Sequence, residues 1–185
     1  MKVYIDPGHG GSDPGAVGMY GTKEADINLE VGLILRELLK KRGVEVIISR
    51  ESNRFVGLTE RAQTANVEKA DAFISIHCNA SINRNAHGFE IYTSPGQTRA
   101  DPLATAIYYA WEQAFPTHKL RPDWSDGDPD KEANYSVLRN TKMPAVLIEL
   151  DFISNPVMEA WLSQKKNQAS MAQTIMLGLF NWYGR

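Results

Sequence analysis

Short apolar segments alternate with amphipathic segments along the whole chain, and this rhythm constrains the fold more than any other feature of the sequence. Apolar runs bounded by glycine and polar residues predict strands, and apolar residues recurring at intervals of three and four predict helices. The predicted strands are Val3–Asp6, Val44–Ser49, Ala72–His77, Gly88–Tyr92 and Ala145–Leu150, and the predicted helices are Asp26–Arg42, Leu58–Lys69, Ala100–Ala114, Pro156–Trp161 and Ala169–Trp182. This alternation predicts an α/β fold with a largely parallel central sheet flanked by helices.

The length of the chain favours a single domain that spans residues 1–185, since a chain of this size forms one core. Only Leu120–Asn134, which is polar and contains two prolines and a glycine, breaks the rhythm. A domain boundary there would leave the strand Ala145–Leu150 in a piece too small to fold. We therefore interpret the segment as a long surface loop that borders the functional site.

The charge balance argues against nucleic acid and anionic membrane as partners. The chain carries 20 basic and 22 acidic side chains, a formal net charge of −2, so no basic excess is present to bind phosphates.

Cys78 is the single cysteine, which excludes an intramolecular disulfide. Met1 leads within a few residues into Pro7 and Gly8, without the apolar stretch of a signal peptide or membrane span. We expect cytoplasmic synthesis with action elsewhere, or a domain cut from a longer protein.

Four chemically capable side chains fall at positions that a parallel sheet would bring to one edge. His9 follows the first strand, and Glu24 lies in the first helical turn after a predicted Thr22 cap. His77 ends its strand, and Glu149 lies near the end of an apolar strand. Parallel α/β sheets place functional groups at the carboxyl ends of their strands.

Two imidazoles and a carboxylate form the ligand set of many catalytic zinc sites, with a further position left open for water. A second carboxylate beside that water can act as a general base and then as an acid. A histidine at a strand end can equally bond to backbone, and a glutamate in a first turn complements the helix dipole. Only Glu149 resists such an interpretation, because a carboxylate in an apolar strand is costly unless it is solvated or paired.

At these residues the sequence resembles the zinc-dependent N-acetylmuramoyl-L-alanine amidase family of bacterial cell-wall hydrolases, autolysins and phage endolysins. The matching segments run in family order over nearly the whole chain: Ile5–Gly11, Lys23–Leu29, Ser75–Ala80, Gly88–Tyr92, Pro144–Glu149 and Phe152–Asn155. The resemblance implies His9, Glu24 and His77 as zinc ligands, and Glu149 as the catalytic carboxylate. It also implies hydrolysis of the amide between N-acetylmuramic acid and L-alanine in peptidoglycan, with no obligate protein partner evident.

Two residues depart from the family pattern. Asp151 stands where the family commonly has glycine, and Cys78 stands where a small residue usually follows the second histidine. Strand alternation predicts that Asp151 shares a face with Glu149, where its charge would raise the pKa of Glu149. The same alternation predicts that Cys78 faces away from His77.

Several other features permit more than one interpretation. The glycine-rich run 8–18 matches neither the dinucleotide-binding fingerprint nor the phosphate-loop motif. Asp126, Asp128 and Asp130 have the opening spacing of a calcium-binding loop. The glycine and the closing glutamate of such a loop are missing, so we predict that this run is a solvated loop. Glu90 could support a metal-bound histidine or form a salt bridge. We expect His87 and His118 to be loop residues and Trp124 to be exposed. We expect the aromatic residues of the helix Ala100–Ala114 and its end to lie in the core: Tyr108, Tyr109, Trp111 and Phe115. A catalytically silent wall-binding module and a stem-peptide carboxypeptidase remain alternatives to the amidase.

Overall fold

Six strands form one sheet in the order β2-β1-β3-β6-β4-β5 in the computed structural model, which describes residues 1–184. The strands are β1 (Lys2–Pro7), β2 (Glu45–Ile48), β3 (Ala72–Asn79), β4 (Glu90–Thr93), β5 (Lys131–Glu132) and β6 (Ala145–Phe152). Neighbouring strands are parallel except β4 and β6, which run antiparallel. The predicted α/β class and largely parallel sheet are therefore confirmed.

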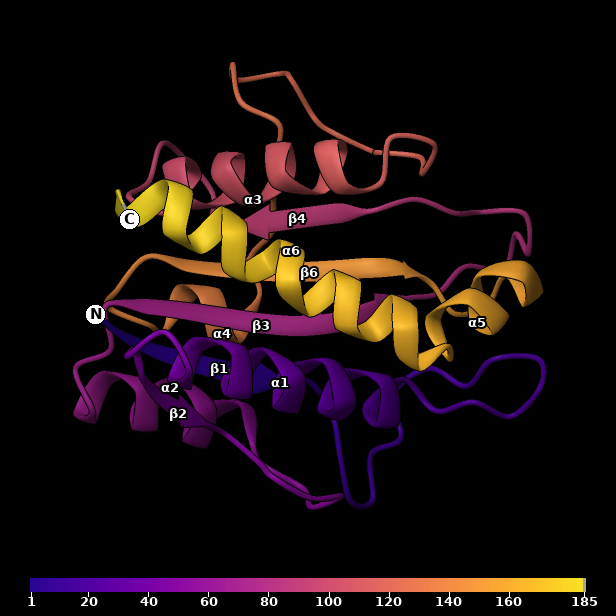
Figure 1. The fold of residues 1–185 in the computed structure, drawn as a ribbon, viewed down its shortest axis with the longest axis horizontal. Helices are drawn as coiled ribbons and strands as arrows, with labels where there is room; N and C mark the ends of the chain where they lie inside the picture. Colours follow the sequence, from indigo (N-terminus) through magenta and orange to yellow (C-terminus); the bar gives the residue numbers. More distant parts are fainter. Residues whose placement is uncertain (185) are drawn as a thin grey trace.

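Helices cover both faces of this sheet (Figure 1). They are α1 (Glu24–Lys40), α2 (Leu58–Val67), α3 (Asp101–Ala114), α4 (Ser136–Arg139), α5 (Pro156–Leu162) and α6 (Lys165–Tyr183). Apolar residues of α1, α3 and α6 share one core cluster, whereas α2 and α4 contribute to a second cluster on the opposite face. Among residues 1–184, no helix combines the length and apolar character needed to cross a membrane.

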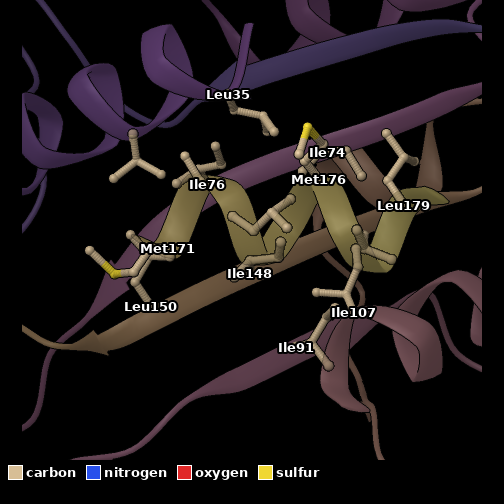
Figure 2. Packing of buried hydrophobic residues seen from close by; sticks show 14 of the residues in the cluster. Leu35, Ile74, Ile76, Ile91, Ile107, Ile148, Leu150, Met171, Met176 and Leu179 are labelled. Atoms are coloured by element: carbon tan, nitrogen blue, oxygen red, sulfur yellow. The ribbon is translucent and has the colours of Figure 1, made fainter. Parts of the chain in front are cut away.

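The larger core lies between the sheet and α6 (Figure 2). Met171, Ile175 and Leu179 recur every four residues along α6, and all three are fully buried. Beneath them the sheet presents Ile74 and Ile148. Each such side chain contributes about 1.5–3 kcal/mol when it is removed from water, so this layer holds the strands in the register that positions the site.

The predicted elements agree with the structure apart from their ends and one cap. Helix α1 begins at Glu24, and its N-cap residue is Lys23, whose side chain makes no capping bond. The predicted Thr22 cap is wrong, because the Thr22 hydroxyl lies 3.4 Å from the Ser163 hydroxyl instead. The two acidic residues Glu24 and Asp26 in the first turn complement the positive end of the helix dipole.

The long segment after α3 also differs slightly from the expected loop. It contributes the short edge strand β5, which pairs with the end of β4. Lys131 of β5 binds Glu90, the cross-strand neighbour of Glu149. The end of the segment therefore approaches the sheet edge where the candidate site lies.

Candidate metal centre

The structure brings His9, Glu24 and His77 together at one edge of the sheet. One possible ligand atom from each residue lies within 4.8 Å of the others, a grouping that could hold a metal ion. His9 follows β1, His77 lies in β3 beside it, and Glu24 is the first residue of α1. Two imidazoles and one carboxylate have the donor chemistry of a catalytic zinc site. The convergence predicted from sequence is thus present in three dimensions.

Glu24 is held firmly at the centre of this group. Its Oε1 lies 2.9 Å from His77 Nδ1 and 3.2 Å from His9 Nε2, and it accepts the backbone N–H of Cys78 at 3.1 Å. Its Oε2 accepts the backbone N–H of Ala16 at 2.8 Å. Burial raises the pKa of Glu24, but the hydrogen bonds from His77 and His9 outweigh it, so this pKa lies well below its usual range. Glu24 is therefore an anion, the form that binds a metal.

Asp13 supports His9 from the other side of the imidazole ring. Its Oδ2 lies 2.8 Å from His9 Nδ1, and its Oδ1 accepts the backbone N–H of Gly15 at 3.0 Å. Burial lowers the pKa of His9, but the hydrogen bonds to Glu24 and Asp13 outweigh this effect and raise it overall. A carboxylate on the second ring nitrogen orients a metal-binding histidine. The sequence does not predict this contact, because a polar loop residue four positions from His9 carries no distinctive signal.

Glu149 lies beside this group and lines a cavity of about 430 Å³ together with His9 and His77. Its Cα is paired in register with that of His77, across β3 and β6. The buried Oε2 of Glu149 has no hydrogen-bond partner among the described residues. Burial, followed by the negative charges of Glu24 and Glu90, raises the pKa of Glu149 well above its usual range. An unpaired carboxylate with a raised pKa is a strong candidate for proton transfer.

Glu90 forms a salt bridge rather than supporting a histidine. Its Oε1 accepts bonds from Arg121 Nε at 2.6 Å and Lys131 Nζ at 2.7 Å, while its Oε2 accepts Tyr92 and Asn79. Burial raises the pKa of Glu90, but the bonds from Lys131 and Arg121 outweigh it and lower this pKa. Of the two interpretations left open by the sequence, the salt bridge is the one observed. Glu90 acts on Glu149 only through its charge.

Asp151 does not share a face with Glu149, so that prediction is wrong. Between the pairs His77–Glu149 and Asn79–Phe152, β6 carries one residue more than β3, and this bulge interrupts the alternation of side chains. Asp151 is fully buried and lies 2.5 Å from His118 Nε2. It is also not among the charges that raise the pKa of Glu149. The departure from the family pattern therefore bears on packing around His118 instead.

Other predictions for single residues have mixed outcomes. Cys78 is buried in the larger core cluster, whereas His77 lines the cavity, so the prediction that Cys78 faces away from His77 is confirmed. His118 does lie in a loop, and Trp124 is exposed. Tyr109 was predicted to be a core residue, but it is 44% exposed because it lies on the outer side of α3, while Tyr108 and Trp111 are buried as predicted.

The acidic loop is less solvated than the sequence predicted. Asp130 is buried, and its Oδ2 accepts a bond from the Thr93 hydroxyl at 2.6 Å. Burial, together with the adjacent carboxyl of Asp128, raises the pKa of Asp130 to about 8. The prediction of a solvated run is wrong for this residue, because the pairing of β5 with β4 draws Asp130 inward.

Two buried arginines near the site are also not predicted by the sequence. Arg50 and Arg61 are 1% and 3% exposed, and both donate to backbone carbonyl groups at the end of β1. Arginine is ordinarily a surface residue, and nothing in the local sequence around either position marks it as buried. Arg61 also lines the cavity.

Comparisons with known proteins identify the family to which the chain belongs. The sequence profile of the N-acetylmuramoyl-L-alanine amidase family matches residues 3–181. The chain is 35% identical over 185 residues to the probable cell wall amidase LytH of Staphylococcus epidermidis, covering 98% of this chain and 58% of that protein. It is 40% identical over 157 residues to the N-acetylmuramoyl-L-alanine amidase CwlM of Bacillus licheniformis, covering 84% of this chain and 58% of the relative.

Among solved structures, the N-acetylmuramoyl-L-alanine amidase AmiC2 of Nostoc punctiforme superimposes with a TM-score of 0.91 at 32% identity, over 100% of this chain and 98% of that one. The chain spans little more than half the length of the curated relatives named above, 58% in each case. The family match nevertheless extends over residues 3–181, nearly every described residue. The chain belongs to the N-acetylmuramoyl-L-alanine amidase family.

Proposed function

We propose that this chain is a zinc-dependent hydrolase that cleaves the amide between N-acetylmuramic acid and L-alanine in bacterial peptidoglycan. The observation that carries the proposal is the grouping of His9, Glu24 and His77 at a cavity that also contains the unpaired carboxylate of Glu149. Membership of the amidase family supplies the substrate class. In this proposal residues 1–185 constitute the catalytic domain.

His9, Glu24 and His77 would hold the zinc ion. The three residues fit this role chemically, because two imidazoles and a carboxylate leave a position open for water or substrate. When bound, zinc supplies Lewis-acid activation of water and of the scissile carbonyl group. The chain's own contribution is to fix the donors, and Asp13 and Ala16 do so by bonding to His9 and Glu24.

Glu149 would transfer the proton during the reaction. Its Oε2 has no partner among residues 1–184, so no internal donor competes for it. Glu149 accepts a proton from the attacking water and returns it to the amine that leaves with the peptide. General acid–base assistance of this kind contributes about 10²–10⁴ in rate.

The cavity is suited to a substrate with both polar and apolar parts. Its polar lining includes His9, His77 and Glu149 together with Asp6 and Arg61. Its apolar lining is formed by Phe55, Val56, Leu58, Tyr135, Val137 and Leu147. We propose that these apolar residues contact the muramoyl-peptide around the scissile amide. The action would take place at the cell wall, the location that the name of the Staphylococcus relative gives for that protein.

Glu149→Gln tests the mechanism with little change in shape. The variant should keep its zinc and lose at least about 10² in turnover on purified cell walls, measured as new L-alanine amino termini. Glu112→Gln is the matched control, because Glu112 is exposed on α3 and should leave turnover unchanged. Near-normal release of L-alanine amino termini by Glu149→Gln would refute the proposed role.

The nature of the products separates the proposed reaction from its alternatives. Mass spectrometry of the digest should find glycan strands separated from intact stem peptides. Release of a single terminal amino acid would indicate a carboxypeptidase instead. Wall binding with no new amino termini, even with zinc added, would indicate a catalytically silent binding module.

A further inference from the structure

Two buried guanidinium groups connect the backbone segments that carry His9 and Glu24. Arg50 follows β2, and its Nη2 donates to the carbonyl oxygens of Gly8 at 2.8 Å and Ala25 at 2.7 Å. Gly8 precedes His9 and Ala25 follows Glu24, so a single nitrogen joins the loop after β1 to the first turn of α1. The Nε of the same side chain donates to Pro7 at 2.9 Å.

Arg61 holds the same loop and shares the Pro7 carbonyl with Arg50. This residue of α2 donates from Nη1 to the Asp6 carboxylate at 2.6 Å and to the Pro7 carbonyl at 2.8 Å. Its Nη2 donates to the carbonyl oxygen of His9 itself at 2.9 Å. Arg61 therefore fixes the backbone of one candidate ligand directly, and its charge is balanced by the buried Asp6.

The backbone at His9 requires such support. His9 has a φ of 60°, in the left-handed region that residues other than glycine adopt rarely. This conformation turns the chain out of β1, and a residue other than glycine keeps it only where the surrounding structure holds it there. Arg50 and Arg61 together donate to the carbonyl groups of all three residues 7–9, and Asn28 also donates to the Gly8 carbonyl at 3.4 Å.

From these contacts we propose that Arg50 and Arg61 are positioning residues that fix the spacing of His9 and Glu24, and so set the affinity of the centre for a divalent metal ion. Neither would touch the metal. Their effect is on the backbone that carries two of the three ligands, while His77 is fixed independently by β3. The inference rests on the proposed metal-binding role of these residues, but not on the identity of the substrate.

Lysine at either position keeps the charge but not the geometry. Guanidinium presents donors in a rigid planar fork, whereas the ammonium group of lysine is a single compact centre. It cannot reach Pro7, Gly8 and Ala25 together as Arg50 does. Loss of groups that support metal ligands reduces metal affinity by about 10–100-fold, and we expect a loss in this range for Arg50→Lys and for Arg61→Lys.

The test measures zinc binding in the chelator-treated full chain, by competition with a chromophoric chelator, and records the absorption spectrum of the Co²⁺-substituted protein. Arg54→Lys is the matched control. Arg54 lies between the two arginines in sequence, yet its side chain donates to the Ser49 carbonyl and lies beside Glu60 instead of bonding to the segments that carry His9 and Glu24. Thermal unfolding establishes that each variant is folded.

The proposal predicts weaker zinc binding and an altered Co²⁺ spectrum for Arg50→Lys and Arg61→Lys, with no change for Arg54→Lys. Folded variants with wild-type zinc affinity and spectrum would overturn it, even if their melting temperatures fall, since a purely structural role predicts that result. If Arg50→Lys does not fold, Arg61→Lys decides by the same criterion. A wild-type chain that binds zinc but leaves the amide intact would refute the proposed function and leave this inference standing.

Discussion

Replacing Gly8 by alanine should disable the centre by moving one ligand while leaving the fold intact. A Cβ atom at Gly8 would lie 2.2 Å from Cε1 and 2.3 Å from Nε2 of His77. Ordinary contact begins at 3.4 Å, so the imidazole ring must withdraw by about 1.2 Å or the loop must shift by a similar distance. Gly8 is not among the glycines with positive φ, so backbone strain does not add to this collision.

The expected loss of zinc binding and turnover follows from how little displacement of its ligands a metal site permits. Ligand distances at such sites must lie within about 0.2 Å of their ideal values, and a misplacement of about 1 Å can cost about 10²-fold in rate. The ring cannot withdraw freely, because His77 Nδ1 is held 2.9 Å from Glu24. Overpacking costs about 1–3 kcal/mol, against a total stability of about 5–15 kcal/mol, so we expect Gly8→Ala to remain folded.

The assay compares zinc affinity and the release of L-alanine amino termini in Gly8→Ala with those in Gly57→Ala. Gly57 is a suitable control, since a Cβ there would have no neighbour within 4 Å and its φ is −68°. Turnover should fall by about 10²-fold for Gly8→Ala, zinc affinity should fall with it, and both should stay unchanged for Gly57→Ala. Wild-type zinc binding and turnover in folded Gly8→Ala would refute the placement of His77 as a ligand.

Three further predictions concern residues around the centre. Asp13→Asn removes the carboxylate that orients His9 and should weaken zinc binding by about 10–100-fold in the chelator competition; unchanged affinity would exclude this role. Burial and the charges of Glu24 and Glu90 raise the pKa of Glu149 in the folded chain above its value in the unfolded chain, about 4.3. Protonation of Glu149 therefore favours the folded state fully below the unfolded pKa. This stabilisation is lost as the pH rises through the folded pKa. Without metal, Glu149→Gln should therefore melt at a higher temperature than the wild type at pH 7 but not at pH 4, and calorimetry showing a lower melting temperature at pH 7 would contradict this. His118→Ala leaves the fully buried Asp151 without its imidazole partner and should cost about 3–5 kcal/mol in urea unfolding, whereas zinc affinity should not change.

The sequence predicts the sheet and the meeting of the four site residues because both depend on regular patterns. Strand ends are visible as apolar runs, and parallel strands bring their carboxyl ends to one edge. His9, His77 and Glu149 lie at or near such ends, so their convergence follows from topology alone. The substrate class came from family resemblance, since side-chain geometry at an edge does not specify a polymer.

What the sequence does not predict depends on irregular backbone. The bulge in β6 turns Asp151 away from Glu149, and alternation cannot anticipate an extra residue. The bonds of Arg50 and Arg61 to carbonyl groups exist only because the loop after β1 folds back on β2 and α2. The role of Asp13 depends on the left-handed backbone of His9 and the loop that follows it.

The most direct test of the central claim is analysis of the products from purified cell walls digested by the zinc-loaded chain, with and without a chelator. The proposed function predicts that L-alanine amino termini appear, that mass spectrometry finds stem peptides separated from glycan strands, and that the chelator abolishes both. Intact muramoyl–alanine bonds after digestion with zinc, or undiminished cleavage in chelator-stripped enzyme, would contradict the account.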